Sequence, residues 1–199
     1  KDACCPPEGT PYDVMCHRVA AEAVLAGAAP LPNRTALAES VQGPAGNDRI
    51  VAEAAFEAAL HAVAELDLPE RSDLMALLVE DHVMHERVLT PAECAELAVL
   101  AYDVQVRDIA AERSRLEDDP SHIELWRQVV QQAVAPFECA PLCLLGLAGW
   151  VAGSGALQVV CMERVETINP DYSLLHVLEE INSRALPPSV WGEMRGGDR

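Results

Sequence analysis

Apolar residues recur at helical spacing nearly throughout the chain from Asp13 onward, and no segment alternates apolar and polar positions as a half-buried strand does. In residues 47–66 a polar side chain recurs every fourth residue, and apolar side chains occupy the face opposite or beside it. The polar positions are Glu53, Glu57, His61 and Glu65, and the apolar ones are Phe56, Leu60 and Val63. The pattern predicts an all-α fold, an irregular helical bundle of roughly eight to ten helices.

Capping signals place several helix starts and stops. A first helix is predicted from Asp13 to Gly27, followed by the turn "APLPN", a short helix that ends near "QGPAGN", and a later helix over 72–87. In "TPAE", Thr90 caps a helix and Glu93 reaches back to the Thr90 amide, which is a capping box. "SHIE" predicts the same device, with the cap at Ser121 and its partner at Glu124.

The final quarter of the chain predicts a long apolar helical hairpin and then a helix over about 171–185. In the hairpin, small and apolar residues fall at spacings that resemble a tetratricopeptide repeat, and Ser154 lies at the turn, where a capping role is expected. The matching positions are Leu145, Gly146, Ala148, Gly153 and Pro170. A single repeat cannot bury its own apolar face, so this hairpin is expected to pack on the other helices.

These patterns divide the chain into three parts. Residues 1–12 form an extended, Pro-rich entry segment, and residues 13–186 form a single all-helical domain with a possible sub-boundary near 117–121. Residues 187–199 form a C-terminal tail that is partly docked on the domain through Trp191 and Met194, because an isolated exposed Trp is uncommon.

The charge balance narrows the set of partners. The formal net charge is −18, from 32 acidic and 14 basic residues, so a nucleic-acid backbone and an anionic membrane surface would both be repelled. The most apolar stretch, 136–153, contains Glu138 and falls short of a membrane span. We therefore expect neither a nucleic-acid partner nor a membrane location. An odd number of cysteines, 7, favours reduced thiols in a cytoplasmic protein.

The segment "HVMHE" is the strongest candidate for metal chemistry. His82, His85 and Glu86 lie at i, i+3 and i+4 of a helix, so their side chains share a face and could approach one ion. Zincin motifs place their histidines four residues apart, and this spacing does not match them. The alternative is that both histidines border the core, which is the interpretation we favour. The expectation is no metal site, with these three residues as weak candidates.

Two further groups of polar or thiol side chains have simpler explanations. Cys139 and Cys143 are one helical turn apart, with Cys161 across the hairpin as a third sulfur, but buried cysteines usually act as small apolar residues. Over 101–119, a helix carries charges of both signs, which is typical of a solvated face. The charged positions are Arg107, Asp108, Glu112, Arg113 and Arg115.

The opening "CCPPEGTPYD", the stretch "VAAEAVLAGAAPLPNR" and the later "APLCLLGLAGWVAGSGALQVVCMERVETINPDYSLLHVLEEI" together resemble an actinobacterial family catalogued as domain of unknown function 4192. The resemblance covers most of the chain. It is strongest at Cys4, Cys5, Pro6, Pro7, Glu8, Gly9, Thr10, Gly27, Pro30, Arg34, Arg107, Asp108, Trp150, Gly153, Gly155, Pro170, Asp171, Tyr172 and Ser173. It implies that this chain is a C-terminal portion of a longer protein, and it implies no reaction and no catalytic residues.

Three functions are compatible with these observations. The first, which we favour, is a protein-interaction or scaffold module that acts with a protein partner or with a preceding N-terminal half. The second is a metal-dependent enzyme or metal-binding protein that uses His82, His85 and Glu86. The third is a redox accessory that uses Cys4 and Cys5, for which packing at the junction with the N-terminal half is the alternative. The sequence predicts no cofactor, favours a function other than catalysis and indicates no oligomeric state.

Overall fold

The computed structural model describes Arg18, residues 33–113 and residues 120–191. Contacts divide the chain into two compact units, residues 1–36 and residues 37–199. Several predicted features lie outside the described residues. These are the entry segment with Cys4 and Cys5, the predicted first helix apart from Arg18, the loop 117–119, and Met194 in the tail.

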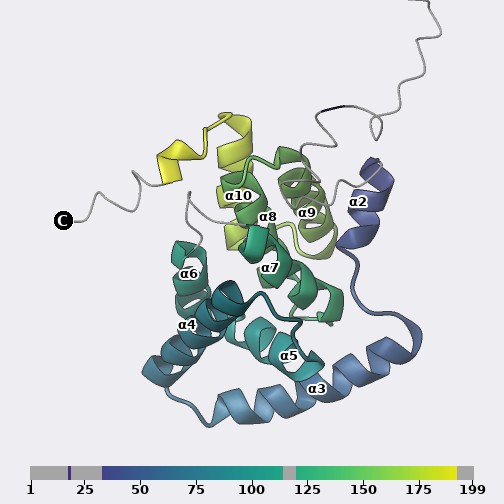
Figure 1. The fold of residues 1–199 in the computed structure, drawn as a ribbon, viewed down its shortest axis with the longest axis vertical. Helices are drawn as coiled ribbons and strands as arrows, with labels where there is room; N and C mark the ends of the chain where they lie inside the picture. The colour runs from purple at the N-terminus through teal and green to yellow at the C-terminus, as the bar shows by residue number, and fades with distance from the viewer. Residues whose placement is uncertain (1–17, 19–32, 114–119, 192–199) are drawn as a thin grey trace, which may run out of the picture. The chain divides into compact units, whose positions relative to one another are not determined.

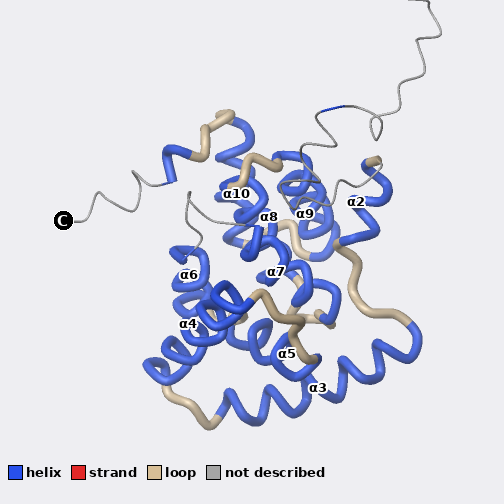
Figure 2. The backbone as a smooth tube through the Cα atoms, in the orientation of Figure 1, coloured by secondary structure: helices blue, strands red, loops and turns tan. Residues whose placement is uncertain are grey.

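The predicted all-α fold is confirmed: the described residues form nine helices, α2 to α10, with no strand among them (Figures 1 and 2). The helices are α2 (Arg34–Ser40), α3 (Gly46–Ala64), α4 (Leu68–His85), α5 (Pro91–Leu100), α6 (Val104–Arg113), α7 (Pro120–Gln132), α8 (Cys139–Val151), α9 (Gly155–Ile168) and α10 (Ser173–Ser183). None of them combines the length and the apolar character that a membrane-crossing helix requires.

Helix α8 lies at the centre of the second unit. All of its residues from Cys139 to Val151 are buried, and it packs against α6, α7, α9 and α10. A helix that is apolar on every side has no face for solvent, so its neighbours must cover it completely. This explains why the most apolar stretch of the sequence is a core helix.

The hairpin of α8 and α9 depends on two glycines. A methyl group on Gly149 would lie 3.2 Å from Leu157 Cβ, and one on Gly146 would lie 3.3 Å from Cys161 Cβ, both tighter than ordinary contacts. Gly153 takes a φ of +76° in the turn. Ser154 occupies the N-cap position of α9 as expected, although its hydroxyl makes no capping hydrogen bond. The likeness of this hairpin to a tetratricopeptide repeat stays a prediction.

Helix starts follow the local capping chemistry. At α5, Glu93 N donates to Thr90 Oγ1 at 3.3 Å and Thr90 N donates to Glu93 Oε2 at 2.8 Å, which confirms the predicted capping box. Helix α4 begins at Leu68, four residues before the predicted start, because Asp67 and Glu70 form a second capping box.

Two details of the predicted helices are wrong. Helix α7 begins at Pro120, so Ser121 lies inside the helix and does not cap it, since proline suits the first helical position. On α3, Leu60 is 44% exposed, whereas Phe56 and Val63 are buried as predicted. The buried side of α3 consists of Ala52, Phe56, Ala59 and Val63. It contains two alanines, whose small side chains allow a close contact with a neighbouring helix.

The C-terminal end of the described residues packs on the hairpin. The Trp191 ring meets the Trp150 ring edge-on, with centroids 6.1 Å apart. Trp150 Nε1 also donates to the Leu186 carbonyl at 2.9 Å. These contacts hold the segment after α10 against α8.

Candidate functional site

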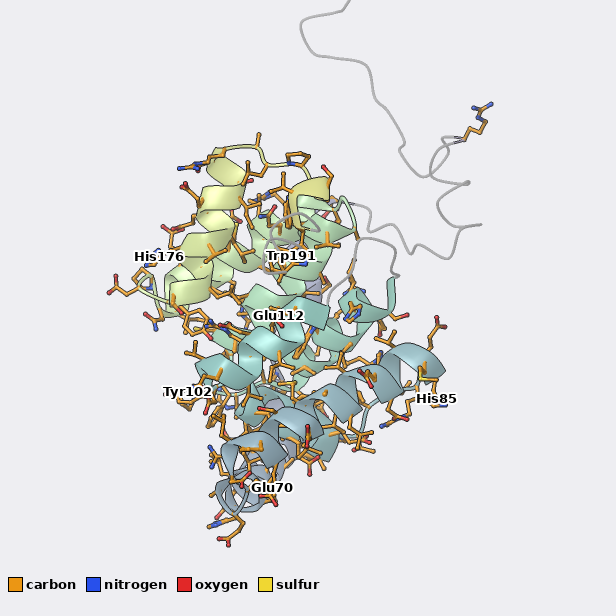
Figure 3. The ribbon with its side chains drawn as sticks, turned by 90° about the vertical axis from the view of Figure 1, so that its left-hand side faces the viewer. Glu70, His85, Tyr102, Glu112, His176 and Trp191 are labelled. Carbon is orange, nitrogen blue, oxygen red and sulfur yellow. The ribbon has the colours of Figure 1, made fainter. Side chains whose placement is uncertain are left out.

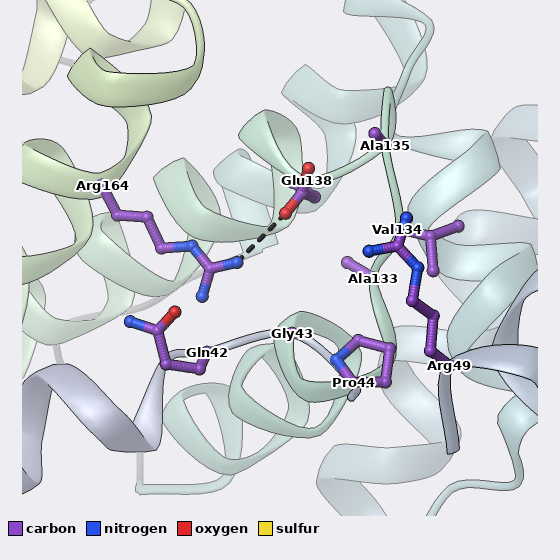
Figure 4. Close-up of a pocket in the computed structure, with 9 residues that line it drawn as sticks. All are labelled: Gln42, Gly43, Pro44, Arg49, Ala133, Val134, Ala135, Glu138 and Arg164. Carbon is purple, nitrogen blue, oxygen red and sulfur yellow. Dashed lines mark hydrogen bonds and ion pairs between the residues drawn. The ribbon is translucent and has the colours of Figure 1, made fainter. Parts of the chain in front are cut away.

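A polar pocket of about 220 Å³ opens beside the start of α8 (Figure 4). Four parts of the second unit contribute to it: the loop before α3, the first turn of α3, the segment that leads into α8, and α9. The lining residues are Gln42, Gly43, Pro44, Arg49, Ala133, Val134, Ala135, Glu138 and Arg164. Charged side chains therefore reach one cavity from α3, α9 and the N-terminal end of α8.

An ion pair forms one wall of this pocket. Arg164 Nη2 lies 3.0 Å from Glu138 Oε1, and Arg164 Nη1 donates to the Val41 carbonyl. The two side chains are only 16% and 19% exposed. Because the pair is shielded and also bonded to the backbone, it fixes the position of α9 against the loop before α3.

Arg49 approaches the pocket from α3 (Figure 4). Its Nε bonds Glu53 Oε1 at 2.8 Å, and the side chain is 58% exposed. The hydrogen bond and charge of Glu53 raise the pKa of Arg49, and the charge of Glu138 acts in the same direction. Within the described part of the chain, the two Nη nitrogens of Arg49 make no hydrogen bond.

Gly43 lets the pocket walls come together. A methyl group at this position would lie 2.9 Å from the Ala133 carbonyl oxygen and 3.4 Å from Arg164 Nη2. Backbone oxygen cannot yield as a flexible side chain can, so only glycine fits here. No pattern in the sequence predicts this pocket, because the "QGPAGN" turn indicates a loop and nothing more.

A second feature is the outward face of α4, which we call the α4 outer face and define as Glu70, Asp73, Leu77, Glu80 and Met84. In Figure 3, α4 runs along the near side between the labelled Glu70 and His85. Leu77 is 63% exposed and Met84 is 77% exposed. The two lie seven residues apart and thus share one helical face, with acidic residues between and beside them.

Arg107 corrects the prediction of a solvated mixed-charge face on α6, because this residue is only 4% exposed. Its Nη2 lies 2.7 Å from Asp108 Oδ1, and its Nη1 donates to Ser173 Oγ at 3.2 Å and to Tyr172 Oη at 3.4 Å. Burial lowers the pKa of Arg107, but the hydrogen bonds that Arg107 donates to Tyr172 and Asp108 outweigh it and raise the pKa overall.

The structure does not bring the three metal candidates together. His82 is 1% exposed and faces the core, whereas the side chain of His85 is 62% exposed and its Nδ1 lies 3.1 Å from Asp81 Oδ1. Glu86 follows the end of α4 with a φ of 46°, which takes it off the helical register. No set of three or more His, Cys, Asp or Glu side chains in the described residues is placed to hold a metal ion.

The ring of His82 is buried. Among the residues that the structure describes, neither Nδ1 nor Nε2 has a hydrogen-bond partner, and the same holds for the buried indole Nε1 of Trp126. Burial lowers the pKa of His82, and Arg87 contributes in the same direction, while Glu124, Asp81 and Glu86 oppose it. Burial of His82 therefore favours the neutral form of its ring.

The described cysteines are core residues. Cys94, Cys139, Cys143 and Cys161 are free thiols and all are buried. Burial raises the pKa of all four thiols, to about 12 for Cys94 and for Cys161. A thiol with a raised pKa is a poor nucleophile and a poor metal ligand at neutral pH.

Comparison with known proteins identifies a family. The family model described as "Domain of unknown function (DUF4192)" matches residues 2–189. No curated protein and no solved structure matches the chain.

Proposed function

Because the chain belongs to the DUF4192 family, whose description assigns no reaction, we propose a function from its own surface: it is a protein-interaction module that binds a basic amphipathic helix of a partner protein on the α4 outer face. The observation that carries this proposal is the exposure of Leu77 and Met84 on one face of α4, 63% and 77%. Leu77 and Met84 lie at i and i+7 of one exposed helical face, which is the spacing of the apolar anchors through which an amphipathic helix contacts its partner.

Charge supports a basic partner. Glu70, Asp73 and Glu80 lie along the α4 outer face beside the apolar pair. The whole chain carries a net charge of −18, so its field attracts a cationic segment at long range. Apolar anchors would supply contact area, and the acidic side chains would select a partner rich in Arg and Lys.

The rest of α4 is suited to present such a face. Met75, Val79 and His82 are buried on the opposite side of the helix, and the capping box of Asp67 and Glu70 fixes its first turn. A helix held on one side by the core offers a preformed surface, which reduces the conformational entropy lost on binding.

The test uses two synthetic helical peptides with the same leucine spacing, one with arginine and one with glutamate at the polar positions. Calorimetric titration of the 199-residue chain should show binding of the arginine peptide and none of the glutamate peptide. The double variant Leu77→Ser/Met84→Ser should weaken binding at least about tenfold, since two apolar anchors are lost.

The control is Val177→Ser on α10, where the native side chain is 42% exposed and lies off the α4 outer face. It should leave the affinity unchanged. If the arginine peptide binds the double variant as well as it binds the native chain, the contact is non-specific attraction to an acidic surface and the proposal is wrong.

A further inference from the structure

We infer that the pocket between Arg49 and Arg164 is a binding site for a small, singly charged oxyanion, a carboxylate or the monoanionic form of a phosphate group. This site is separate from the α4 outer face and does not depend on the function proposed for it.

The size of the pocket limits the ligand. Its volume of about 220 Å³ is below the range of about 300–1,000 Å³ typical of sites for drug-sized molecules. A nucleotide or a dinucleotide is too large, whereas a small organic acid or a phosphate group fits. The same volume accommodates one acidic group at the end of a larger molecule.

The lining carries groups that can bind an anion. Two guanidinium groups, Arg49 and Arg164, and one carboxylate, Glu138, line the cavity. The carboxylate of Glu53, which pairs with Arg49 at 2.8 Å, balances the remaining positive charge. An anion is therefore held only through direct contact with the guanidinium groups, because a chain with a net charge of −18 gives it no long-range attraction.

Arg49 supplies the direct contact. Its Nε is taken by Glu53, but Nη1 and Nη2 make no hydrogen bond within the described residues, and Figure 4 shows the guanidinium directed along the wall formed by Val134 and Ala135. The planar fork of a guanidinium matches the two oxygens of a carboxylate or a phosphate. The free donors of Arg49 therefore face the space that a ligand would fill.

The opposite wall limits the ligand charge. Arg164 is held by Glu138 at 3.0 Å and by the Val41 carbonyl, so it stays in place whether or not a ligand is bound. Because Glu138 also faces the cavity, a second negative charge on the ligand would be repelled. This arrangement favours a monoanion over a dianion.

The test is a titration of the ¹⁵N-labelled chain with acetate and, separately, with inorganic phosphate, at constant ionic strength, followed through the Gly43 amide signal. We expect saturable shifts at Gly43. Shifts with acetate alone identify a carboxylate site, shifts with phosphate alone identify a phosphate site, and shifts with both identify a general oxyanion site. The absence of saturation with either probe overturns the inference.

A matched pair of variants tests the role of Arg49. Arg49 forms an exposed i,i+4 pair with Glu53, and Arg184 forms an equivalent pair with Glu180 on α10, with the arginines 58% and 68% exposed. Arg49→Gln should weaken binding at least about fivefold, since the anion loses a charged hydrogen-bond donor. Arg184→Gln removes the same charge at another place and should change the affinity less than about twofold.

Equal loss in both variants would mean that net charge alone controls binding, and the inference would be wrong. The circular dichroism melting temperature of Arg49→Gln should match that of the native chain, because the replaced pair is exposed. The variant Leu77→Ser/Met84→Ser should bind the anion normally, which separates a failure here from a failure of the proposed peptide interaction.

Discussion

The guanidinium carbon of Arg107 on α6 lies 5.7 Å from the ring centroid of Tyr172, a residue 65 positions later in the chain at the start of α10. The same guanidinium donates to Tyr172 Oη and Ser173 Oγ. A cation over an aromatic ring and two hydrogen bonds thus join two helices distant in sequence. Arg107 is a structural connection between α6 and α10.

This contact predicts that Arg107→Ala lowers the free energy of unfolding by about 2–4 kcal/mol, because a buried charged network is broken. Tyr172→Phe keeps the ring and should cost about 0.5–1.5 kcal/mol for the lost hydroxyl. The free energies of unfolding of both variants can be measured by unfolding in urea. Arg184→Gln, with its arginine 68% exposed, should cost less than about 0.5 kcal/mol. Equal losses at Arg107 and Arg184 would contradict the prediction.

The close approach of α8 and α9 predicts opposite effects for two glycines. Gly149→Ala would place a methyl group 3.2 Å from Leu157 Cβ and should destabilise the chain by about 0.5–2 kcal/mol, even after the gain in helix propensity. Gly155→Ala, in the first turn of α9, meets no atom of the described residues within 4 Å and should be neutral or stabilising by up to about 1 kcal/mol. Thermal unfolding of both variants tests this prediction. A higher melting temperature of Gly149→Ala would contradict it, because α8 and α9 could then move apart without a loss of stability.

The buried imidazole of His82 predicts a pH-dependent stability. Burial lowers its pKa in the folded chain below the ordinary value of 6.5, so the unfolded chain takes up a proton first as the pH falls. Stability therefore decreases as the pH falls below about 6.5 and is unaffected by this group above it. His82→Leu should reduce that decrease and should be neutral or stabilising at pH 7 by up to about 2 kcal/mol, because two unbonded ring nitrogens are removed.

The measurement for His82 is the free energy of unfolding in urea at pH 7.5 and at pH 5.5. His61→Gln is the control, because it also removes one histidine, but one that is exposed on α3. If the stability of His82→Leu depended on pH in the same way as that of the native chain, burial would not lower the pKa of His82, and the prediction would be wrong.

The capping box of α5 predicts stability that is lost in acid. The hydrogen bond from Arg87 lowers the pKa of Glu93 to about 2, opposed by partial burial and assisted by the Thr90 amide and hydroxyl. A carboxyl with a lowered folded pKa stabilises the chain above its unfolded pKa of about 4.5 and loses this contribution as the pH falls from there to about 2.

Glu93→Gln should therefore lower stability at pH 6 by about 1–2 kcal/mol, with allowance for the one-third exposure of Arg87, and should have little effect near pH 2. Guanidinium unfolding at both pH values provides the measurement. Glu53→Gln, where the carboxylate is 52% exposed, is the matched control and should cost less than about 0.5 kcal/mol at either pH. A loss for Glu93→Gln that is the same at pH 2 and pH 6 would contradict the assignment.

The sequence predicts the bounds of a helix correctly where a signal within one short segment decides them. The box of Thr90 and Glu93 is confirmed, and α10 lies within the helix predicted over 171–185. Helix α4 begins four residues before its predicted start, at an equivalent box of Asp67 and Glu70, and that signal too is present in the sequence. These features depend on residues no more than four positions apart, for which spacing is sufficient evidence.

The sequence does not predict the burial or the partners of the candidate site residues in the same way. The mixed charges of its helix predict that Arg107 faces solvent, yet Arg107 is buried, because its partners Tyr172 and Ser173 belong to a distant segment at the start of α10. His82 and His85 share a short motif, yet one faces the core and the other faces solvent. Spacing along a helix shows which side chains share a face, but it does not show which neighbour covers that face.

The sequence by itself determined the helices, because apolar periodicity and capping chemistry are local and each helix carries its own signals. Only the tertiary structure decided which polar groups are buried and which converge, since both depend on helix packing between distant segments. Arg49 and Arg164 are 115 positions apart and line one pocket only because Gly43 lets the loop before α3 approach Ala133. A property that requires three segments to meet in space has no counterpart in the spacing of residues along the chain.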